Sequence, residues 1–176
     1  QQLDKAKKMD TSEDEYYSII EKKTASLIAS CCAIGAVSAG ADTEQTETLR
    51  QFGINAGIAF QIRDDIFDYQ PNNKSGKGYG NDIREHKMTL PLIHLLRESS
   101  LTERTVIKTK IVLSGKKKKT IDEIISLANE KHSIEYATEK MNMYIGKAES
   151  QLNKLGDNEA CNDLRNLMYY CIKREK

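Results

Sequence analysis

Apolar residues recur every three to four positions along nearly the whole chain, and no stretch alternates with the period of two that is typical of strands. This pattern predicts an all-α protein. Ser12 with Glu15, and Thr120 with Glu123, have the spacing of capping boxes, which mark helix starts. With the Gly, Pro and Asn residues as stops, we expect helices at about 12–40, 43–69, 89–98, 102–115, 120–131, 133–155 and 158–172.

The composition narrows the class of protein. The 176 residues carry a net charge of +1, which gives no sign of a nucleic-acid partner or a polybasic membrane tail. The stretch 25–41 comes closest to an integral membrane segment, but its small residues favour a tightly packed buried helix. The length favours one domain, and no signal peptide is visible, so we expect a cytoplasmic protein. Because the chain opens on Gln1 rather than Met, we expect it to be a fragment or a processed product.

Three carboxylates, Asp64, Asp65 and Asp68, lie within five positions of a largely apolar helical segment. Helix geometry places Asp64 and Asp68 about 40° apart around the axis and Asp65 about 100° from Asp64, so we expect one broad face. Like charges on one face repel, and a divalent cation relieves that repulsion. Hard oxygen ligands suit Mg²⁺ bound together with a phosphate-bearing substrate. The alternative is a solvated acidic patch at a helix end, which the apolar neighbours make less favourable.

Several basic residues have the chemistry of a phosphate site. The segment 72–81 combines glycines, which let the backbone approach a ligand, with Lys77. Lys87 directly precedes a predicted helix, and Lys23 with Thr24 lies where the first helix turns from polar to small and apolar. An ammonium and a hydroxyl there would suit a diphosphate. Taken alone, each feature is better explained by a flexible surface loop or a solvated lysine.

Taken in order, these features form a longer pattern. The segments are Tyr17…Lys23-Thr24-Ala25, then Phe60-Gln61-x-x-Asp64-Asp65-x-x-Asp68, then Gly76-Lys77-x-x-Gly80-x-Asp82-Ile83-x-Glu85-x-Lys87-x-Thr89-Leu90-Pro91. Their order, spacing and residue types resemble the C-terminal half of a trans-isoprenyl (polyprenyl) diphosphate synthase, and the resemblance extends through the whole chain.

The resemblance implies an isoprenoid synthase-type helical bundle around a central cavity, with residues 1–176 forming the C-terminal portion of a single catalytic domain. It implies a prenyltransferase of isoprenoid biosynthesis that condenses an allylic diphosphate with isopentenyl diphosphate and releases pyrophosphate. The implied cofactor is Mg²⁺, and the implied assembly is a homodimer.

The resemblance also implies roles for individual residues. The metal ligands would be Asp64, Asp65 and Asp68, which hold Mg²⁺ against the allylic diphosphate. The residues that contact this diphosphate or lie near it would be Lys23, Lys77 and Lys87. Thr24 and Gln61 would line the reacting end of the cavity, and Phe60 would lie near the isopentenyl group. Of these, Lys23, Thr24, Gln61 and Lys87 are the candidate catalytic residues.

One part of the family pattern is missing. The family has a first aspartate-rich motif on an earlier helix, whereas Asp-Asp occurs only at Asp64-Asp65 here. We therefore expect the chain to be inactive alone. Other hypotheses are a non-catalytic partner subunit of a heteromeric prenyl synthase, a related terpene cyclase or head-to-head synthase, and a helical interaction domain with a solvated acidic patch. The intact aspartates argue against the partner subunit, and the Gly-Lys-x-x-Gly-x-Asp-Ile run argues against the related enzymes.

Overall fold

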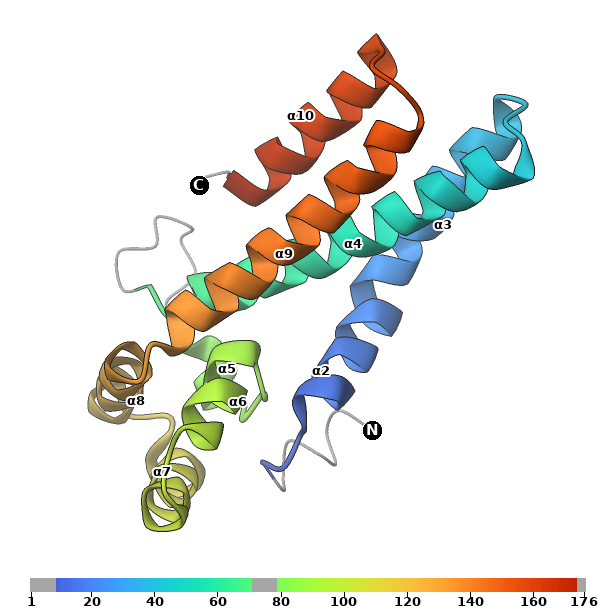
Figure 1. Cartoon of the computed structure of the whole chain (residues 1–176). Coiled ribbons are helices and arrows are strands. Elements are labelled where there is room, and N and C mark those ends of the chain that lie inside the picture. The colour runs from blue at the N-terminus through green and yellow to red at the C-terminus, as the bar shows by residue number, and fades with distance from the viewer. Residues whose placement is uncertain (1–8, 71–78, 174–176) are drawn as a thin grey trace. The chain divides into compact units, whose positions relative to one another are not determined.

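The computed structural model describes residues 9–70 and 79–173, and every regular element in that part of the chain is a helix (Figure 1). The all-α prediction is confirmed. In chain order the elements are α2 (Glu13–Ile20), the π-helix η1 (Glu21–Ala25), α3 (Ser26–Ser38), α4 (Thr43–Phe67), α5 (Asn81–Arg84), α6 (Leu90–Arg97), α7 (Leu101–Ser114), α8 (Lys118–Glu130), α9 (Ser133–Lys154) and α10 (Glu159–Lys173).

The chain divides into two compact units. Of the described residues, the first unit contains 9–16, 64–70 and 79–139, and the second contains 17–63 and 140–173. The long helices α4 and α9 therefore each supply residues to both units. That residues 1–176 belong to one catalytic domain stays a prediction.

Two helix starts test the capping predictions. Ser12 and Glu15 form the expected box, since the Glu15 amide donates to Ser12 Oγ at 3.2 Å and the Ser12 amide donates to Glu15 Oε2 at 3.1 Å. The predicted box at Thr120 is wrong. Helix α8 already begins at Lys118, and Thr120 is buried on the same face as Ile121 and Ile124. The helix begins two residues earlier than the sequence signal suggested, with Lys118 and Lys119 exposed ahead of its buried face.

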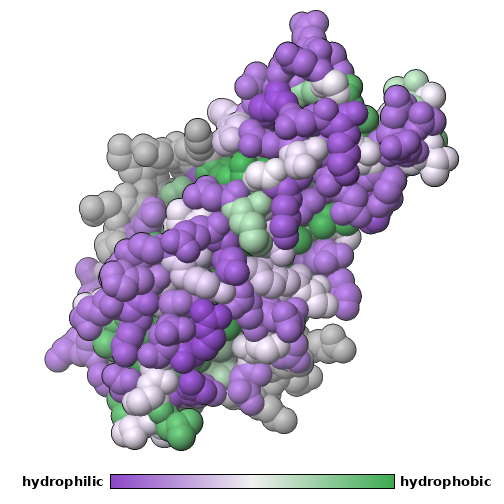
Figure 2. Space-filling model, viewed as in Figure 1, coloured by the Kyte–Doolittle hydropathy of each residue, from purple (hydrophilic) through white to green (hydrophobic). Residues whose placement is uncertain are grey.

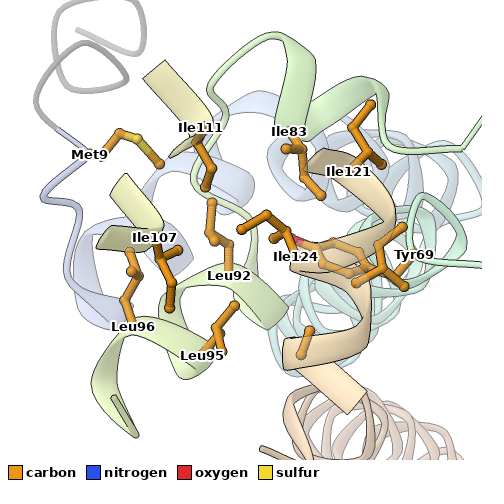
Figure 3. Packing of buried hydrophobic residues seen from close by; sticks show 12 residues of the cluster. Met9, Tyr69, Ile83, Leu92, Leu95, Leu96, Ile107, Ile111, Ile121 and Ile124 are labelled. Carbon is orange, nitrogen blue, oxygen red and sulfur yellow. The ribbon is translucent and has the colours of Figure 1, made fainter. Parts of the chain in front are cut away.

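The core of the first unit forms around α6. Residues 90–96 of this helix are all buried, which leaves α6 with almost no solvent-facing side. Leu92 lies among Ile107 and Ile111 of α7 and Ile124 of α8 (Figure 3). Residues from outside these helices, such as Tyr69 at the end of α4, complete the same cluster. This packing fixes the segment that follows the aspartates, through Tyr69 and Ile83.

In the second unit, α4 approaches the preceding helix very closely. A Cβ atom on Gly53 would lie 2.6 Å from the Ala29 Cα atom, and one on Gly57 would lie 2.6 Å from the Ala25 Cα atom. Real side chains do not tolerate such distances, so only glycine fits at these two positions of α4. The close approach brings Thr24 of η1 next to Gln61 of α4.

Helix α3 differs from its sequence expectation. The stretch 25–41 was expected to be tightly packed and buried, but only Ala29 and Ala36 are buried within α3. Leu27, Ile34 and Val37 are 68%, 66% and 62% exposed. The face drawn in Figure 2 is mostly hydrophilic, with hydrophobic residues reaching the surface in separate places. Among the residues that the structure describes, no helix has the length and apolar character needed to cross a bilayer.

Candidate functional site

Asp68 joins the end of α4 to the start of α5. Its Oδ1 atom accepts the amide of Asn81 at 2.9 Å, and its Oδ2 atom accepts the amide of Asp82 at 2.8 Å. Its carbonyl oxygen accepts the amide of Gly80 at 2.7 Å. Gly80 has a φ of 72°, the left-handed region that glycine adopts without strain. The carboxylate therefore caps a helix start and joins two ends that lie a dozen residues apart in the sequence.

The same capped turn holds Lys87. Lys87 Nζ donates to Asp82 Oδ1 at 3.1 Å and pairs with Glu85 Oε2 at 2.7 Å, and its side chain is 50% exposed. The Glu85 hydrogen bond is the main reason that the pKa of Lys87 lies above its ordinary value. The ammonium is therefore charged and partly open to solvent. Asp68, Asp82 and Lys87 form one connected polar chain.

The three aspartates have different surroundings. Asp64 is exposed, Asp65 is 5% exposed, and Asp68 is intermediate. The Tyr16 hydroxyl donates to Asp65 Oδ2 at 2.7 Å, and both residues are buried. Burial raises the pKa of Asp68 above its usual value, and the charge of Asp82 adds to the rise, although the two amide hydrogen bonds oppose it. The three carboxylates of the expected single face therefore differ. Asp64 is open to solvent, Asp65 is buried, and Asp68 caps the start of α5.

The three carboxylates offer an incomplete set of metal ligands. Within residues 9–70 and 79–173, no group of three or more His, Cys, Asp or Glu side chains has the geometry of a metal site. Mg²⁺ needs no such cage, because it keeps several waters and binds one or two carboxylates together with substrate phosphates. The exposed Asp64 and the remaining lone pairs of Asp68 match that incomplete coordination. The donor set thus fits Mg²⁺ delivered with a phosphate ligand.

The other predicted residues lie in the second unit. Lys23 and Thr24 belong to η1, where the helix widens from α to π geometry. Thr24 Oγ1 donates to Gln61 Oε1 at 2.9 Å. Lys23 is exposed, whereas Phe60 and Gln61 are intermediate. Single π turns inside α-helices are rare and frequent at functional sites.

The structure thus joins the predicted residues in two groups. The aspartates and Lys87 lie in the first unit, and Thr24 and Gln61 lie in the second. Lys77 lies outside the described residues. Sequence reasoning gave no role to Tyr16 or to Asp82, which hold Asp65 and Lys87. Asp82 stood inside the recognised pattern and was open to notice, whereas that pattern included Tyr17 and not Tyr16.

Comparison with known proteins gives a consistent result. The family model for polyprenyl synthetase matches residues 1–128. The octaprenyl diphosphate synthase of Haemophilus influenzae is 33% identical over 175 residues, which are 99% of this chain and 53% of that protein. The heptaprenyl diphosphate synthase component 2 of Bacillus subtilis is 32% identical over 161 residues, 91% of this chain and 45% of that protein.

A solved structure extends the similarity to the fold. The polyprenyl synthase from Caulobacter crescentus, complexed with calcium and isoprenyl diphosphate, has a TM-score of 0.89 and 30% identity, covering 99% of this chain and 54% of that one. This chain spans about half the length of the curated relatives that it matches. The matched relatives are prenyl diphosphate synthases, and the family model covers most of the sequence. The chain therefore belongs to the polyprenyl synthetase family.

Proposed function

We propose that this chain supplies the allylic diphosphate-binding part of a Mg²⁺-dependent prenyltransferase. The full reaction would condense an allylic diphosphate with isopentenyl diphosphate and release pyrophosphate. The family membership supports the reaction class. The exposed Asp64, next to the helix-capping Asp68, supports the binding of a diphosphate together with a cation. In line with the family resemblance, we propose a cytoplasmic homodimer with residues 1–176 inside one catalytic domain.

The observation that carries the proposal is the polar chain from Asp68 through Asp82 to Lys87. It joins a carboxylate turn to an ammonium group within one unit, with hydrogen bonds of 2.8 Å and 3.1 Å. Carboxylates alone would attract only a cation, and a lysine alone would attract only an anion. Their connection suits a cation and a phosphate bound together.

Each residue has a part in this proposal. Asp64 and Asp68 hold the cation, Asp65 adds charge from the buried side of the same turn, and the lysines Lys23, Lys77 and Lys87 bind the diphosphate oxygens. When bound, Mg²⁺ stabilises the negative charge that develops on the leaving pyrophosphate. Thr24 and Gln61, joined by their hydrogen bond, line the reacting end. Phe60 contributes an apolar wall that keeps water from the allylic cation.

A second candidate is a subunit of a heteromeric synthase. The similarity to a protein named as component 2 of a heptaprenyl diphosphate synthase favours it. In this case the chain would still bind the allylic diphosphate, because the aspartates and Lys87 are present, but a different polypeptide would complete the enzyme.

Isothermal titration tests the diphosphate site. We expect the chain to bind a non-hydrolysable allylic diphosphate analogue in the presence of Mg²⁺ and to lose that binding in EDTA. The Asp64→Asn variant removes the exposed carboxylate charge without changing the shape of the side chain. It should lower the affinity about tenfold or more, in keeping with loss of a charged metal ligand.

Glu44→Gln is the matched control, because Glu44 is an exposed carboxylate in the first turn of the same helix. It should bind as the wild type does. Binding that is independent of Mg²⁺, or equal weakening by both substitutions, would contradict the proposed site and favour a solvated acidic patch.

A further inference from the structure

The hydrogen bond between Tyr16 and Asp65 lies outside the roles assigned above. The Tyr16 hydroxyl donates to Asp65 Oδ2 at 2.7 Å, and the two residues are 3% and 5% exposed. A carboxylate removed from water needs such a donor, since an unsatisfied buried charge is strongly destabilising. Hydrogen bonds to a charged acceptor are about twice as strong as neutral ones. The bond therefore fixes Asp65 firmly.

We propose that Tyr16 is a positioning residue for the metal–diphosphate site and that it acts through Asp65. This inference rests on the proposed function, because it concerns the orientation of the same aspartate turn. Tyr16 itself need not touch the cation or the diphosphate.

The aspartates lie at the C-terminal end of α4. The last turn of α4 has carbonyl groups without helical partners, and such turns fray unless side chains hold them. Here two carboxylates hold the turn from different elements. Asp65 is bound by Tyr16 of α2, and Asp68 is bound by the first amides of α5. Two separate attachments fix the rotation of the turn about its axis, whereas one would leave it free to twist.

The neighbouring Asp64 depends on that rotation. It precedes Asp65 directly, so helix geometry sets it about 100° away around the axis. With Asp65 held on the buried side, Asp64 is kept exposed. A ligand that is already oriented loses less entropy when the cation and diphosphate bind, which is the general benefit of preorganisation.

Helix α2, which carries Tyr16, is itself held in place by hydrogen bonds. One turn earlier in α2, Glu13 accepts hydrogen bonds from Arg97 Nη1 at 2.9 Å and from the Tyr136 hydroxyl at 2.8 Å. These partners lie on α6 and α9, within the first unit. Tyr16 therefore lies on a helix that is hydrogen-bonded to α6 and α9. These bonds limit the movement of α2 and so hold the Tyr16 hydroxyl in place against Asp65.

Tyr16→Phe removes only the hydroxyl. We expect the variant to bind the allylic diphosphate analogue with Mg²⁺ about tenfold more weakly by isothermal titration, as loss of a charge-assisted hydrogen bond would give. Asp65→Asn should weaken binding to a similar degree. In the Asp65→Asn background, Tyr16→Phe should add less than about a twofold effect, because residues that act as one unit are not additive.

Tyr169→Phe is the matched control, since its hydroxyl donates to Glu149 Oε1 at 2.9 Å in the second unit. It should keep wild-type affinity. A merely structural role for Tyr16 would lower the unfolding midpoint of Tyr16→Phe and leave its affinity unchanged, and that result would overturn the inference while the proposed function stands. If Tyr16→Phe does not fold, Asp65→Asn with wild-type affinity overturns it equally. Absence of binding by the wild type would overturn the proposed function and this inference together.

Discussion

His94 is a buried titratable residue in the first unit. Its ring stacks on that of Tyr136, with centroids 4.1 Å apart, and its Nδ1 atom lies 3.0 Å from the hydroxyl of Ser133. Burial lowers the pKa of His94 below its ordinary value, and the positive charge of Arg97 lowers it further, against the opposing charges of Glu98 and Glu13. The folded protein therefore favours the neutral ring.

The direction in which stability changes with pH follows from comparing proton uptake by His94 in the folded and unfolded states. The unfolded chain takes up the proton near pH 6.5, above the lowered pKa of the folded state. The stability contributed by neutral His94 is thus present above about pH 6.5 and is lost as pH falls through the folded pKa. We expect the free energy of unfolding, measured in urea, to fall with decreasing pH in this window. His94→Gln should flatten the slope.

The aspartates show how far sequence reasoning reaches at this scale. Their spacing was enough to predict a shared helix and a candidate metal site. It was not enough to separate an exposed Asp64 from a buried Asp65, because that difference depends on Tyr16, which is 49 positions away from Asp65 in the sequence. The capping role of Asp68 was also not predictable, because the two amides that it binds lie 13 and 14 positions further along the chain.

At the scale of elements, the close contact between α4 and the η1–α3 segment yields a sharp prediction. In Gly57→Ala the new methyl group would meet Ala25 Cα at 2.6 Å and Ala25 Cβ at 2.9 Å, so the backbones must move apart. We expect a loss of about 1–3 kcal/mol in the free energy of unfolding, as is usual for overpacking. The same movement would disturb the hydrogen bond between Thr24 and Gln61.

Gly146→Ala provides the control for this change. Gly146 lies within α9, and a Cβ atom there would meet nothing within 4 Å. Because alanine favours helix over glycine, this variant should gain up to about 1 kcal/mol. Urea unfolding of both variants tests the packing. A Gly57→Ala protein as stable as Gly146→Ala would mean that the two helices do not meet as closely as described.

Helix positions were predictable because periodicity and stop residues act locally. The expected first helix, at 12–40, corresponds to α2, η1 and α3 together, and the expected second helix corresponds to α4. The π turn within the first helix was not predictable, because its apolar spacing matches a plain helix. The short α5 was also missed, since it exists through the capping by Asp68 rather than through its own four residues.

At the scale of the whole molecule, the exposed apolar residues of α3 have a consequence in solution. Apolar residues gathered on one exposed helix face promote association. Leu27, Ile34 and Val37 follow one another on α3 at spacings of seven and three positions, and each is more than 60% exposed. We expect this chain by itself to self-associate as its concentration rises, measured by light scattering after size exclusion. Ile34→Lys should reduce the association, whereas Thr109→Lys, at an exposed polar position on α7, should not.

The contacts of the described residues group into two units, a feature that the length-based prediction of one domain does not address. Grouping of this kind arises from pairings distant in the chain, such as residues 9–16 with 64–139, which no local pattern encodes. The family resemblance supplied the function class that local physics could not supply. The different environments of Asp64, Asp65 and Asp68, in contrast, depend on residues that are distant in the sequence and could be found only in the three-dimensional structure.

The π turn at η1 also bears on how this helix tolerates change in length. A single π turn holds one residue more than the α-helix that it interrupts, so it resembles an insertion absorbed without a break. Deleting Lys22 from η1 would let the segment return to plain α geometry while the residues on either side kept their directions, because one π turn with its extra residue and one α turn without it cover nearly the same rotation. The change in length would thus be absorbed within this turn. The same deletion in the middle of a plain α-helix would instead rotate one part by about 100° relative to the other.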